Sequence, residues 1–376
     1  MTTDKLEEKK LVVIQLGGGN DALNTIIPYD DALYYDNRPF LSIPQEKILP
    51  IDEHLGFNPT LLPLMKLWNA GDMAIINGIG YPKPNRSHFR AMDIWHTAEP
   101  ETIGADGWLG RAIREIDPIG ENVVTGVNFG RGLPRALFSE GASVASVGNL
   151  GSYGLLPDIK DESYRAMTLE ALAQMYGTAG KDQMGLFFSQ TGSNALKGAD
   201  VLRRAPQEYT SSIEYAENPI AQSLKSVAQV LCGGTGTRIF YAQHGSFDSH
   251  SAQLTNHPKL WTEVSNAVSD FMDDLREHDQ YKNTVILMFS EFGRRVKDNG
   301  SGTDHGSGGT AFMIGGTVKG GLYGDYPSIK EKNLVEGDMV FNNDFRQTYA
   351  TIAEKWLNVD PLVVANGDFE QFSYLD

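Results

Sequence analysis

The sequence predicts an α/β fold, a doubly wound, mostly parallel sheet flanked by helices. Six short apolar runs, several rich in β-branched residues, have the composition of buried parallel strands. They lie at residues 11–16, 73–78, 122–130, 238–245, 284–290 and 310–316. Helical patterns lie between several of these runs, and such alternation is typical of doubly wound sheets, which bind ligands beyond the carboxyl ends of their strands.

The first run, LVVIQL, ends in the glycines of residues 17–19 and is expected to be a buried strand. The clearest helix directly precedes the run at 284–290. Its apolar residues follow one another at steps of three or four, which places them on one stripe facing a sheet. They are Leu260, Val264, Val268, Phe271 and Leu275.

The chain of 376 residues is expected to form a single domain, 1–376, with a helical insertion at 152–226. That stretch is polar and helix-prone, as in LEALAQMYGTAG, and has no strand pattern. It would lie beside the core as a lid or a docking surface. With 41% hydrophobic and 21% charged residues, the chain has enough apolar material for a buried core.

The formal charge of -16 disfavours nucleic acid as a partner, because binding to phosphate backbones needs clustered Lys and Arg. The single cysteine, Cys232, excludes an intrachain disulfide. No apolar run is long enough for a transmembrane segment, and the start MTTDKLEEKK is too charged for a signal peptide. Either the protein is cytoplasmic or a leader is absent from this chain.

Acidic and imidazole side chains fall close to the ends of four of the predicted strands. Such a crevice gathers negative charge, and carboxylate with imidazole suits Zn, Mn or Fe. Each residue alone also has a simpler explanation as turn chemistry or as part of a surface loop, and the coincidence favours a site. The candidate ligands are Asp21, Asp248, His250, Glu291, Asp304 and His305.

Several motifs occur in one order along nearly the whole chain. They include IQLGGGNDALNTIIPYDD, PNRSHFRAMDIW, FDSHSAQ, FSEFGRRVKDNGSGTDHGSGG and DFRQTYATIAEKWL. In these segments the chain resembles the family catalogued as domain of unknown function 1501, which is placed in the alkaline phosphatase and sulfatase superfamily. The resemblance implies an alkaline phosphatase-like fold.

The resemblance also implies roles for particular residues. Asp21 matches an Asp that bridges metal and substrate, and Ser87 matches a nucleophile near the start of a helix. Asp248, His250 and His305 match the ligands of one metal ion. The superfamily pattern has an Asp-His dipeptide for a second ion, and here it reads Glu291-Phe292, so a carboxylate is kept and an imidazole is lost. His88 or Asp304 is a candidate for the missing ligand.

Two candidate catalytic residues have structural alternatives. Ser87 is either the nucleophile or the cap of the following helix. Arg294 is either a clamp for an oxyanion, with its neighbour Arg295, or a structural ion-pair partner. The chain has no sulfatase-type Cys/Ser-x-Pro/Ala-x-Arg signature, and Cys232 is in the wrong place to replace it.

Together these features predict a metal-dependent hydrolase of a phosphate or sulfate ester, holding one or two divalent transition-metal ions, Zn or Mn. Ser87 or a metal-bound water would attack. The expected partner is a small anionic ester or a sulfated or phosphorylated glycan. The alternative is a non-catalytic, metal-stabilised binding or scaffold protein on the same fold. The resemblance favours a periplasmic or secreted protein over a cytoplasmic one.

Overall fold

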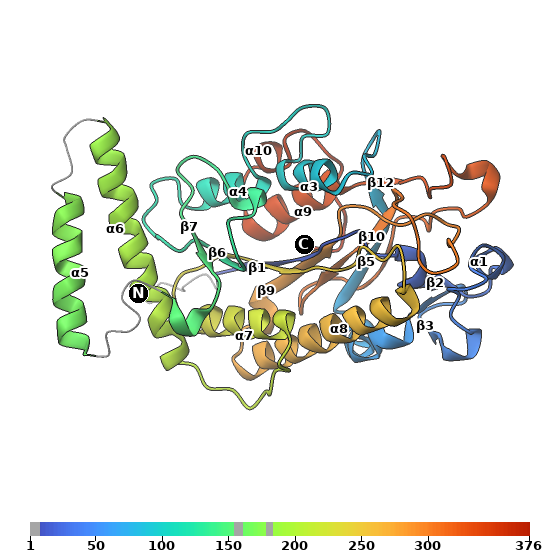
Figure 1. The fold of residues 1–376 in the computed structure, drawn as a ribbon, viewed down its shortest axis with the longest axis horizontal. Helices are drawn as coiled ribbons and strands as arrows, with labels where there is room; N and C mark the ends of the chain where they lie inside the picture. Colours follow the sequence, from blue (N-terminus) through green and yellow to red (C-terminus); the bar gives the residue numbers. More distant parts are fainter. Residues whose placement is uncertain (1–7, 154–160, 178–182) are drawn as a thin grey trace.

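A large mixed sheet forms the centre of the protein (Figure 1), and the computed structural model describes residues 8–153, 161–177 and 183–376. Its strands are β1 (Lys10–Leu16), β5 (Met73–Gly80), β6 (Gly126–Phe129), β7 (Val144–Val147), β8 (Ile239–His244), β9 (Thr284–Phe289), β10 (Gly309–Ile314), β11 (Gly321–Tyr323) and β12 (Asn343–Asp344). Their order is β11-β5-β10-β9-β1-β8-β6-β7, with β12 paired to β5. A small separate sheet, in the order β2-β4-β3, consists of β2 (Ile26–Pro28), β3 (Leu49–Pro50) and β4 (Leu55–Phe57).

All six predicted strands are confirmed, and they lie in the large sheet. β1 pairs in parallel with β8 and β9, and β8 pairs in parallel with β6. β10 runs antiparallel to β5 and β9. β6 begins at Gly126, later than the predicted run at 122–130, because the Asn122 side chain accepts a hydrogen bond from the Val124 amide in a turn.

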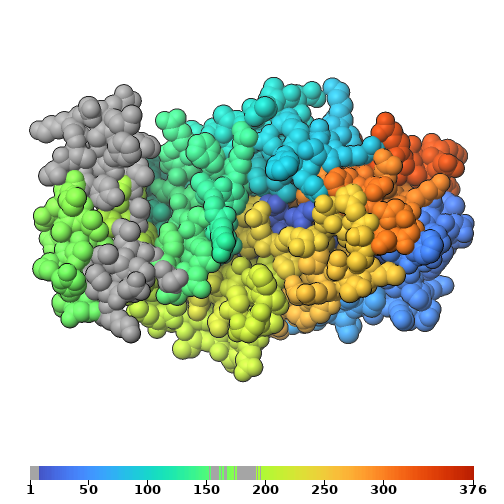
Figure 2. Space-filling model, viewed as in Figure 1, coloured from blue at the N-terminus to red at the C-terminus, as the bar shows by residue number. Residues whose placement is uncertain are grey.

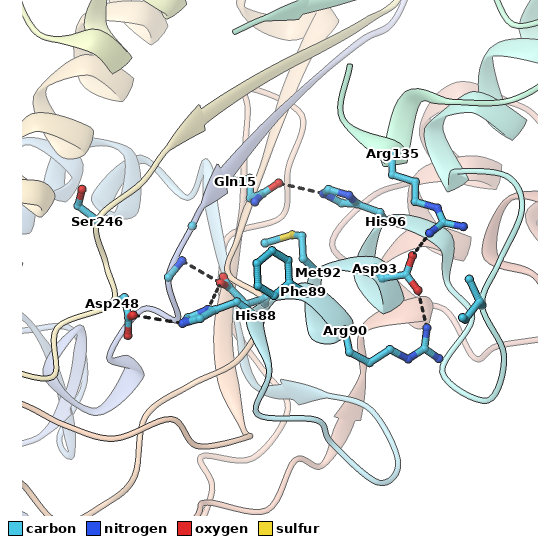
Figure 3. Close-up of a pocket in the computed structure, with 14 residues that line it drawn as sticks. Gln15, His88, Phe89, Arg90, Met92, Asp93, His96, Arg135, Ser246 and Asp248 are labelled. Carbon is cyan, nitrogen blue, oxygen red and sulfur yellow. Dashed lines mark hydrogen bonds and ion pairs between the residues drawn. The ribbon is translucent and has the colours of Figure 1, made fainter. Parts of the chain in front are cut away.

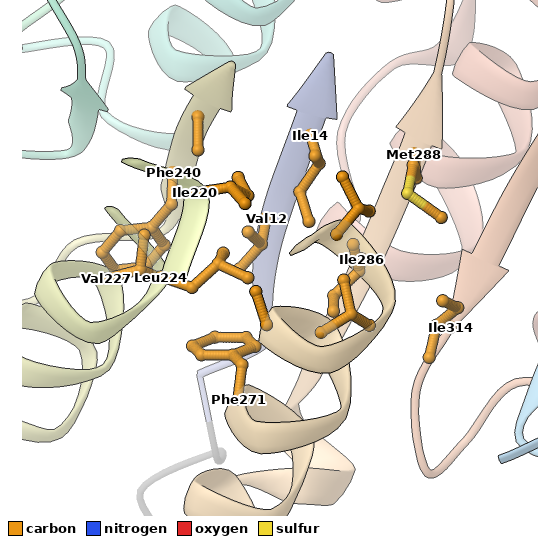
Figure 4. Packing of buried hydrophobic residues seen from close by; sticks show 14 of the residues in the cluster. Val12, Ile14, Ile220, Leu224, Val227, Phe240, Phe271, Ile286, Met288 and Ile314 are labelled. Atoms are coloured by element: carbon orange, nitrogen blue, oxygen red, sulfur yellow. The ribbon is translucent and has the colours of Figure 1, made fainter. Parts of the chain in front are cut away.

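Helices cover both faces of the large sheet. They are α1 (Ala32–Asn37), α2 (Met65–Ala70), α3 (His88–Thr97), α4 (Trp108–Ile116), α5 (Glu162–Gly177), α6 (Gln183–Arg204), α7 (Pro219–Cys232), α8 (Gln253–Glu277), α9 (Phe345–Thr351) and α10 (Pro361–Ala365). In β1, Val12 and Ile14 face the core beneath α7 and α8 (Figure 4), whereas Leu11 and Val13 face the core beneath α3, α4 and α9. This alternation buries both faces of the strand, as a doubly wound sheet requires.

The helix predicted from the stripe between Leu260 and Leu275 is α8, and all five residues of that stripe are buried. α8 starts at Gln253, earlier than the apolar pattern indicates. Its N-cap residue, Ala252, has a φ of 53°, a left-handed conformation that costs energy in a residue with a Cβ. The loop that connects β8 to α8 is therefore held in a strained shape.

The described part of residues 152–226 contains α5, α6 and the beginning of α7, and residues 154–160 and 178–182 of the predicted insertion lie outside the described residues. Figure 1 shows α5 and α6 side by side at one end of the molecule. The segment before α7 is tied to α8, because the hydroxyls of Tyr209 and Tyr215 donate to Asp274 Oδ2 at 2.5 and 2.6 Å. The single domain with an insertion stays a prediction.

In the described ranges, no helix is both long enough and apolar enough to cross a membrane. The longest of them, α8, has 25 residues and includes charged side chains such as Lys259, Glu263 and Arg276. The extracytoplasmic location expected from the resemblance stays a prediction.

Candidate metal centre

The candidate site lies where the carboxyl ends of β1, β8 and β9 meet. These parallel strands end at one edge of the sheet, so the loops that follow them, 17–21, 245–252 and 290–294, come together there. β10 is antiparallel, and the loop 303–307 therefore reaches the same edge before β10 begins. The first turn of α3 completes the site.

Imidazole and carboxylate groups converge at this edge. One nitrogen each of His88 and His305 and one oxygen of Asp248 lie within 4.8 Å of one another. His250 Nε2 lies 3.0 Å from Asp248 Oδ1 and 2.9 Å from His305 Nε2. The structure thus brings the predicted ligands Asp248, His250 and His305 together, and it adds His88, which the sequence offered only as a substitute ligand.

Two of the histidines are oriented by acceptors at Nδ1. His88 Nδ1 lies 2.8 Å from Glu291 Oε1, and His305 Nδ1 lies 2.8 Å from the carbonyl oxygen of Arg86. Because a carboxylate or a carbonyl can only accept, each Nδ1 carries a proton, and a ring in its neutral form then presents its lone pair at Nε2. The predicted ligand Glu291, itself only 2% exposed, therefore supports His88 and also accepts from the Gly18 amide at 2.8 Å.

His250 follows the same rule, since its Nδ1 lies 3.2 Å from Asp304 Oδ1. The predicted ligand Asp304 is thus the hydrogen-bond acceptor that orients His250. The Nε2 lone pairs of His250 and His305 then face each other at 2.9 Å, where they repel unless a cation or a proton lies between them. His88 Nε2 is buried without a hydrogen-bond partner among the described residues. These residues fit a transition-metal ion held by three imidazoles and the Asp248 carboxylate.

Arg294 keeps Asp248 charged. Burial raises the pKa of Asp248, but the hydrogen bond from Arg294, at 2.8 Å, and the charge of that guanidinium outweigh it and hold that pKa well below its usual range. The Arg294 guanidinium also donates to the carbonyls of Gly19 at 2.7 Å and Thr303 at 2.9 Å. Since its side chain is 0% exposed, Arg294 reaches no open space, and the predicted oxyanion clamp has no support in this geometry.

Asp21 is not brought to the cluster. Its Oδ2 and Oδ1 accept from Arg38 at 2.6 and 3.0 Å, and Gln253 also donates to Oδ2. Burial would raise the pKa of Asp21, but the charge of Arg38 reverses that effect and lowers it. Both oxygens are thus engaged, and the carboxylate predicted to bridge metal and substrate lies in an ion pair that is 0% exposed on each side.

Ser87 occupies the N-cap position of α3 but does not act as a cap. Its backbone is extended, with φ −84° and ψ 123°, and its side chain makes no capping hydrogen bond. The side chain is exposed, directly between Arg86 and His88 in sequence. Its role as nucleophile stays a prediction.

A pocket of about 770 Å³ opens beside the cluster, lined by the metal-site residues His88, Asp248 and Glu291 together with Phe89 and Ile103. Figure 2 shows the blue end of β1 at the bottom of a hollow in this face. Ser87 is not among the described residues that line this pocket.

The other end of this pocket holds an ion-pair network that the sequence did not indicate. Figure 3 shows Asp93 between Arg90 and Arg135, and each of its oxygens lies 2.5 Å from one guanidinium. Nearby, burial lowers the pKa of His96 to about 4, so the ring is neutral at pH 7, and its Nε2 lies 3.0 Å from Gln15 Oε1. Arg90 and Asp93 lie in the motif PNRSHFRAMDIW, but no spacing in the sequence reveals their pairing with Arg135.

Gly18 gives a test of how tightly the loop before Asp21 is packed against the site. Its φ is +118°, and a Cβ there would lie 2.4 Å from the Asp248 amide nitrogen. We expect Gly18→Ala to lower the free energy of unfolding by about 3 kcal/mol, from left-handed strain plus overpacking, and to weaken metal binding by displacing Asp248.

Gly71 is the matched control for that substitution. Its φ is +78°, with nothing within 4 Å of the added Cβ, so Gly71→Ala should cost only about 1 kcal/mol and leave metal binding unchanged. Urea unfolding and metal titration measure both quantities. Equal effects of the two substitutions would contradict the close approach of Gly18 to Asp248.

Comparison with curated proteins finds no match. Among solved structures, the chain is similar to a protein in the alkaline phosphatase superfamily from Vibrio parahaemolyticus, with 9% identity, 95% of this chain and 69% of that chain covered and a TM-score of 0.42. It is similar to the PsFucS1 sulfatase from Pseudoalteromonas sp., with 11% identity, 98% of this chain and 72% of that chain covered and a TM-score of 0.43. It is also similar to the alkaline phosphatase from the Antarctic bacterium TAB5, with 12% identity, 84% of this chain and 95% of that chain covered and a TM-score of 0.35.

A family model described as "Protein of unknown function (DUF1501)" matches residues 80–354. The match includes α3, β8, β9 and β10, and with them His88, Asp248, His250 and His305. The chain therefore belongs to the DUF1501 family.

Proposed function

We propose that the chain is a metal-dependent hydrolase of a phosphate or sulfate ester, in which Ser87 or a water molecule attacks the ester. The observation that carries the proposal is the convergence of the His88, His250 and His305 Nε2 atoms on the Asp248 carboxylate. Each histidine has an acceptor at Nδ1, the arrangement that orients and strengthens imidazole ligands of metals.

The donor set favours one ion. Three imidazoles and one carboxylate suit Zn²⁺ or Mn²⁺ better than Ca²⁺ or Mg²⁺, which prefer oxygen ligands. When bound, such an ion supplies Lewis acidity to the ester and favours its attack by a nucleophile. A second ion would need further ligands, and Asp21, the first candidate, is already paired with Arg38.

Residues of the chain have three further roles in the proposed reaction: they keep the metal ligand charged, hold the ester and supply a candidate nucleophile. Arg294 holds Asp248 deprotonated, so the ligand is ready at neutral pH. The pocket beside the cluster accommodates the organic part of the ester, against the exposed side chains of Phe89 and Ile103. Ser87 is adjacent in sequence to the ligand His88, and its exposed hydroxyl is a candidate to attack a group held at the metal.

Turnover of p-nitrophenyl phosphate and p-nitrophenyl sulfate tests the proposal. The protein loaded with Zn²⁺ or Mn²⁺ should hydrolyse one of them, and a chelator or His305→Ala should abolish the activity. His54→Ala, in a histidine whose side chain is 72% exposed, is the control and should have no effect. Ser87→Ala separates the two nucleophiles: kcat should fall by about a hundredfold or more if the serine attacks, and stay unchanged if water does.

The alternative is a metal-stabilised binding or scaffold protein. Two observations favour it: Arg294 is buried, and Ser87 is not among the described residues that line the pocket. It predicts a protein that binds the metal and gains stability from it but hydrolyses neither ester. That result would overturn the hydrolase.

A further inference from the structure

A second cavity, of about 600 Å³, lies at the carboxyl ends of β6 and β7. It is bounded on one side by the loops that follow these strands and on the other by one face of α7. None of the metal-site residues lines it. The cavity is therefore separate from the pocket beside the metal centre, although both open at the same edge of the sheet.

Residues of two neighbouring strands line the two cavities. Gln15 of β1 lines the pocket at the metal centre, and Gln243 of β8 lines the second cavity. These two residues are partners in the parallel β1–β8 ladder. Paired strands lie about 4.8 Å apart, so a ligand that crosses this step can occupy both cavities.

The lining of the second cavity is polar and locally basic. Gln229 and Ser223 of α7 face it together with Gln243, and the cations are Arg131 and Lys225. Among the described residues that line it, none is acidic, although the whole chain has a charge of -16. Such a local excess of positive charge attracts anions.

Four of these polar side chains are not used by the described part of the fold. In the described part of the chain, the side chains of Arg131, Lys225, Gln229 and Gln243 have no hydrogen-bond or ion-pair partner. An amide both donates and accepts, which matches the paired hydroxyls of a sugar, and a guanidinium matches the oxygens of a sulfate or phosphate group. The combination suits a sugar that carries an anionic substituent.

The loop that carries Arg131 is held in place. Asn128 Nδ2 donates to the carbonyl oxygen of Gly132 at 2.7 Å, and the Ser146 hydroxyl donates to the same oxygen at 2.5 Å. Both donors come from strands, Asn128 from β6 and Ser146 from β7. A position fixed by two strands limits the entropy lost when a ligand binds there.

We infer that the second cavity binds a further sugar unit, with an anionic substituent, of an oligosaccharide whose reacting ester lies at the metal centre. This inference rests on the proposed function for the position of the ester and names the substrate class as an anionic oligosaccharide. A small aryl ester would occupy the first pocket alone.

Calorimetric binding of sulfated dextran oligosaccharides to the full chain tests the inference, with unsulfated dextran of the same lengths as reference. Wild-type protein should bind the sulfated hexasaccharide more tightly than the disaccharide. The doubly substituted Arg131→Ala, Lys225→Ala protein should lose about tenfold or more in affinity for the hexasaccharide, through two lost charge-assisted contacts. Gln243→Ala should weaken sulfated and unsulfated hexasaccharides alike.

Lys282→Ala is the charge-matched control. Lys282 is exposed beside the amino end of β9, at the opposite edge of the sheet, so its loss should not change binding. Equal affinity of the wild-type and doubly substituted proteins, or no gain from disaccharide to hexasaccharide, would overturn the inference. Turnover of the aryl esters by the wild-type protein is a separate readout: if it is absent while these binding differences appear, the second cavity stands and the hydrolase falls.

Discussion

Purified protein is expected to bind one transition-metal ion per chain, and Asp248→Asn to weaken that binding by about a hundredfold or more. Asp248 is the one carboxylate that all three imidazoles approach, with His88 Nε2 at 3.4 Å and the other two Nε2 atoms at 3.0 Å. Asn keeps the shape of the side chain but removes the charge that attracts the ion. Elemental analysis counts and names the metal, and competition with a chelator gives the affinity.

Substitutions of the carboxylates that accept from the histidines at Nδ1 should weaken metal binding by less than Asp248→Asn does. Glu291→Gln removes the acceptor charge at His88 Nδ1, and Asp304→Asn does the same at His250. Each should cost about 10- to 100-fold in metal affinity, less than the loss of a direct ligand. His54→Ala is again the control. If Asp248→Asn, Glu291→Gln and Asp304→Asn all bound metal as the wild type does, the cluster would have no role as a metal centre.

Metal should also stabilise the folded chain. At a free concentration of one hundred times Kd, an ion that binds only the native state adds about 2.7 kcal/mol to the free energy of unfolding. Urea unfolding with and without Zn²⁺ measures this increment, which Asp248→Asn should remove. Since the Asp248 side chain is 43% exposed, its substitution should leave the metal-free protein folded, and the metal-free unfolding curve checks this.

The sequence predicted this site as far as position along strands could indicate it. Asp248 and His250 directly follow a buried run, and His305 directly precedes another, so their meeting at one edge follows from the sheet. His88 was harder, because the loop 81–87 separates it from β5 and no strand pattern adjoins it. Glu291 was recognised by its strand end, but its contact with His88 depends on how α3 docks.

The fold was predictable to a similar degree. The buried runs of β1, β8 and β9 identify strands, because a stretch apolar on both faces fits only the inside of a covered sheet. Their composition says nothing about direction, and the antiparallel pairing of β10 was therefore not predicted. β11 and β12, with three and two residues, are too short to give a pattern.

Arg38 had no local signal at all, because its partner Asp21 lies 17 residues away across β2 and α1. We expect Arg38→Met to lower the free energy of unfolding by about 3–5 kcal/mol, because it leaves Asp21 as an unpaired buried charge. It also removes donors to the carbonyl oxygens of Val296, at 2.5 Å, and Arg295, at 2.9 Å. Urea unfolding at neutral pH measures the loss.

Two further variants separate the cost of the unpaired buried charge from the cost of losing an arginine side chain. Arg204→Met, in the more exposed pair with Asp200, should cost at most about 0.5 kcal/mol. Asp21→Asn combined with Arg38→Met should be less destabilising than Arg38→Met alone, because the stranded carboxylate is gone. A loss in Arg38→Met as small as that in Arg204→Met would contradict the buried pair.

Arg38→Met also tests how many metal ions the chain binds. With Arg38 in place, both oxygens of Asp21 are engaged, and the donors of His88, His250, His305 and Asp248 account for one ion. Arg38→Met should still bind one ion per chain, because the buried Asp21 lies apart from these donors. A second ion bound only when Arg38 is removed would instead show that the guanidinium occupies the place of a cation, with Asp21 as its ligand.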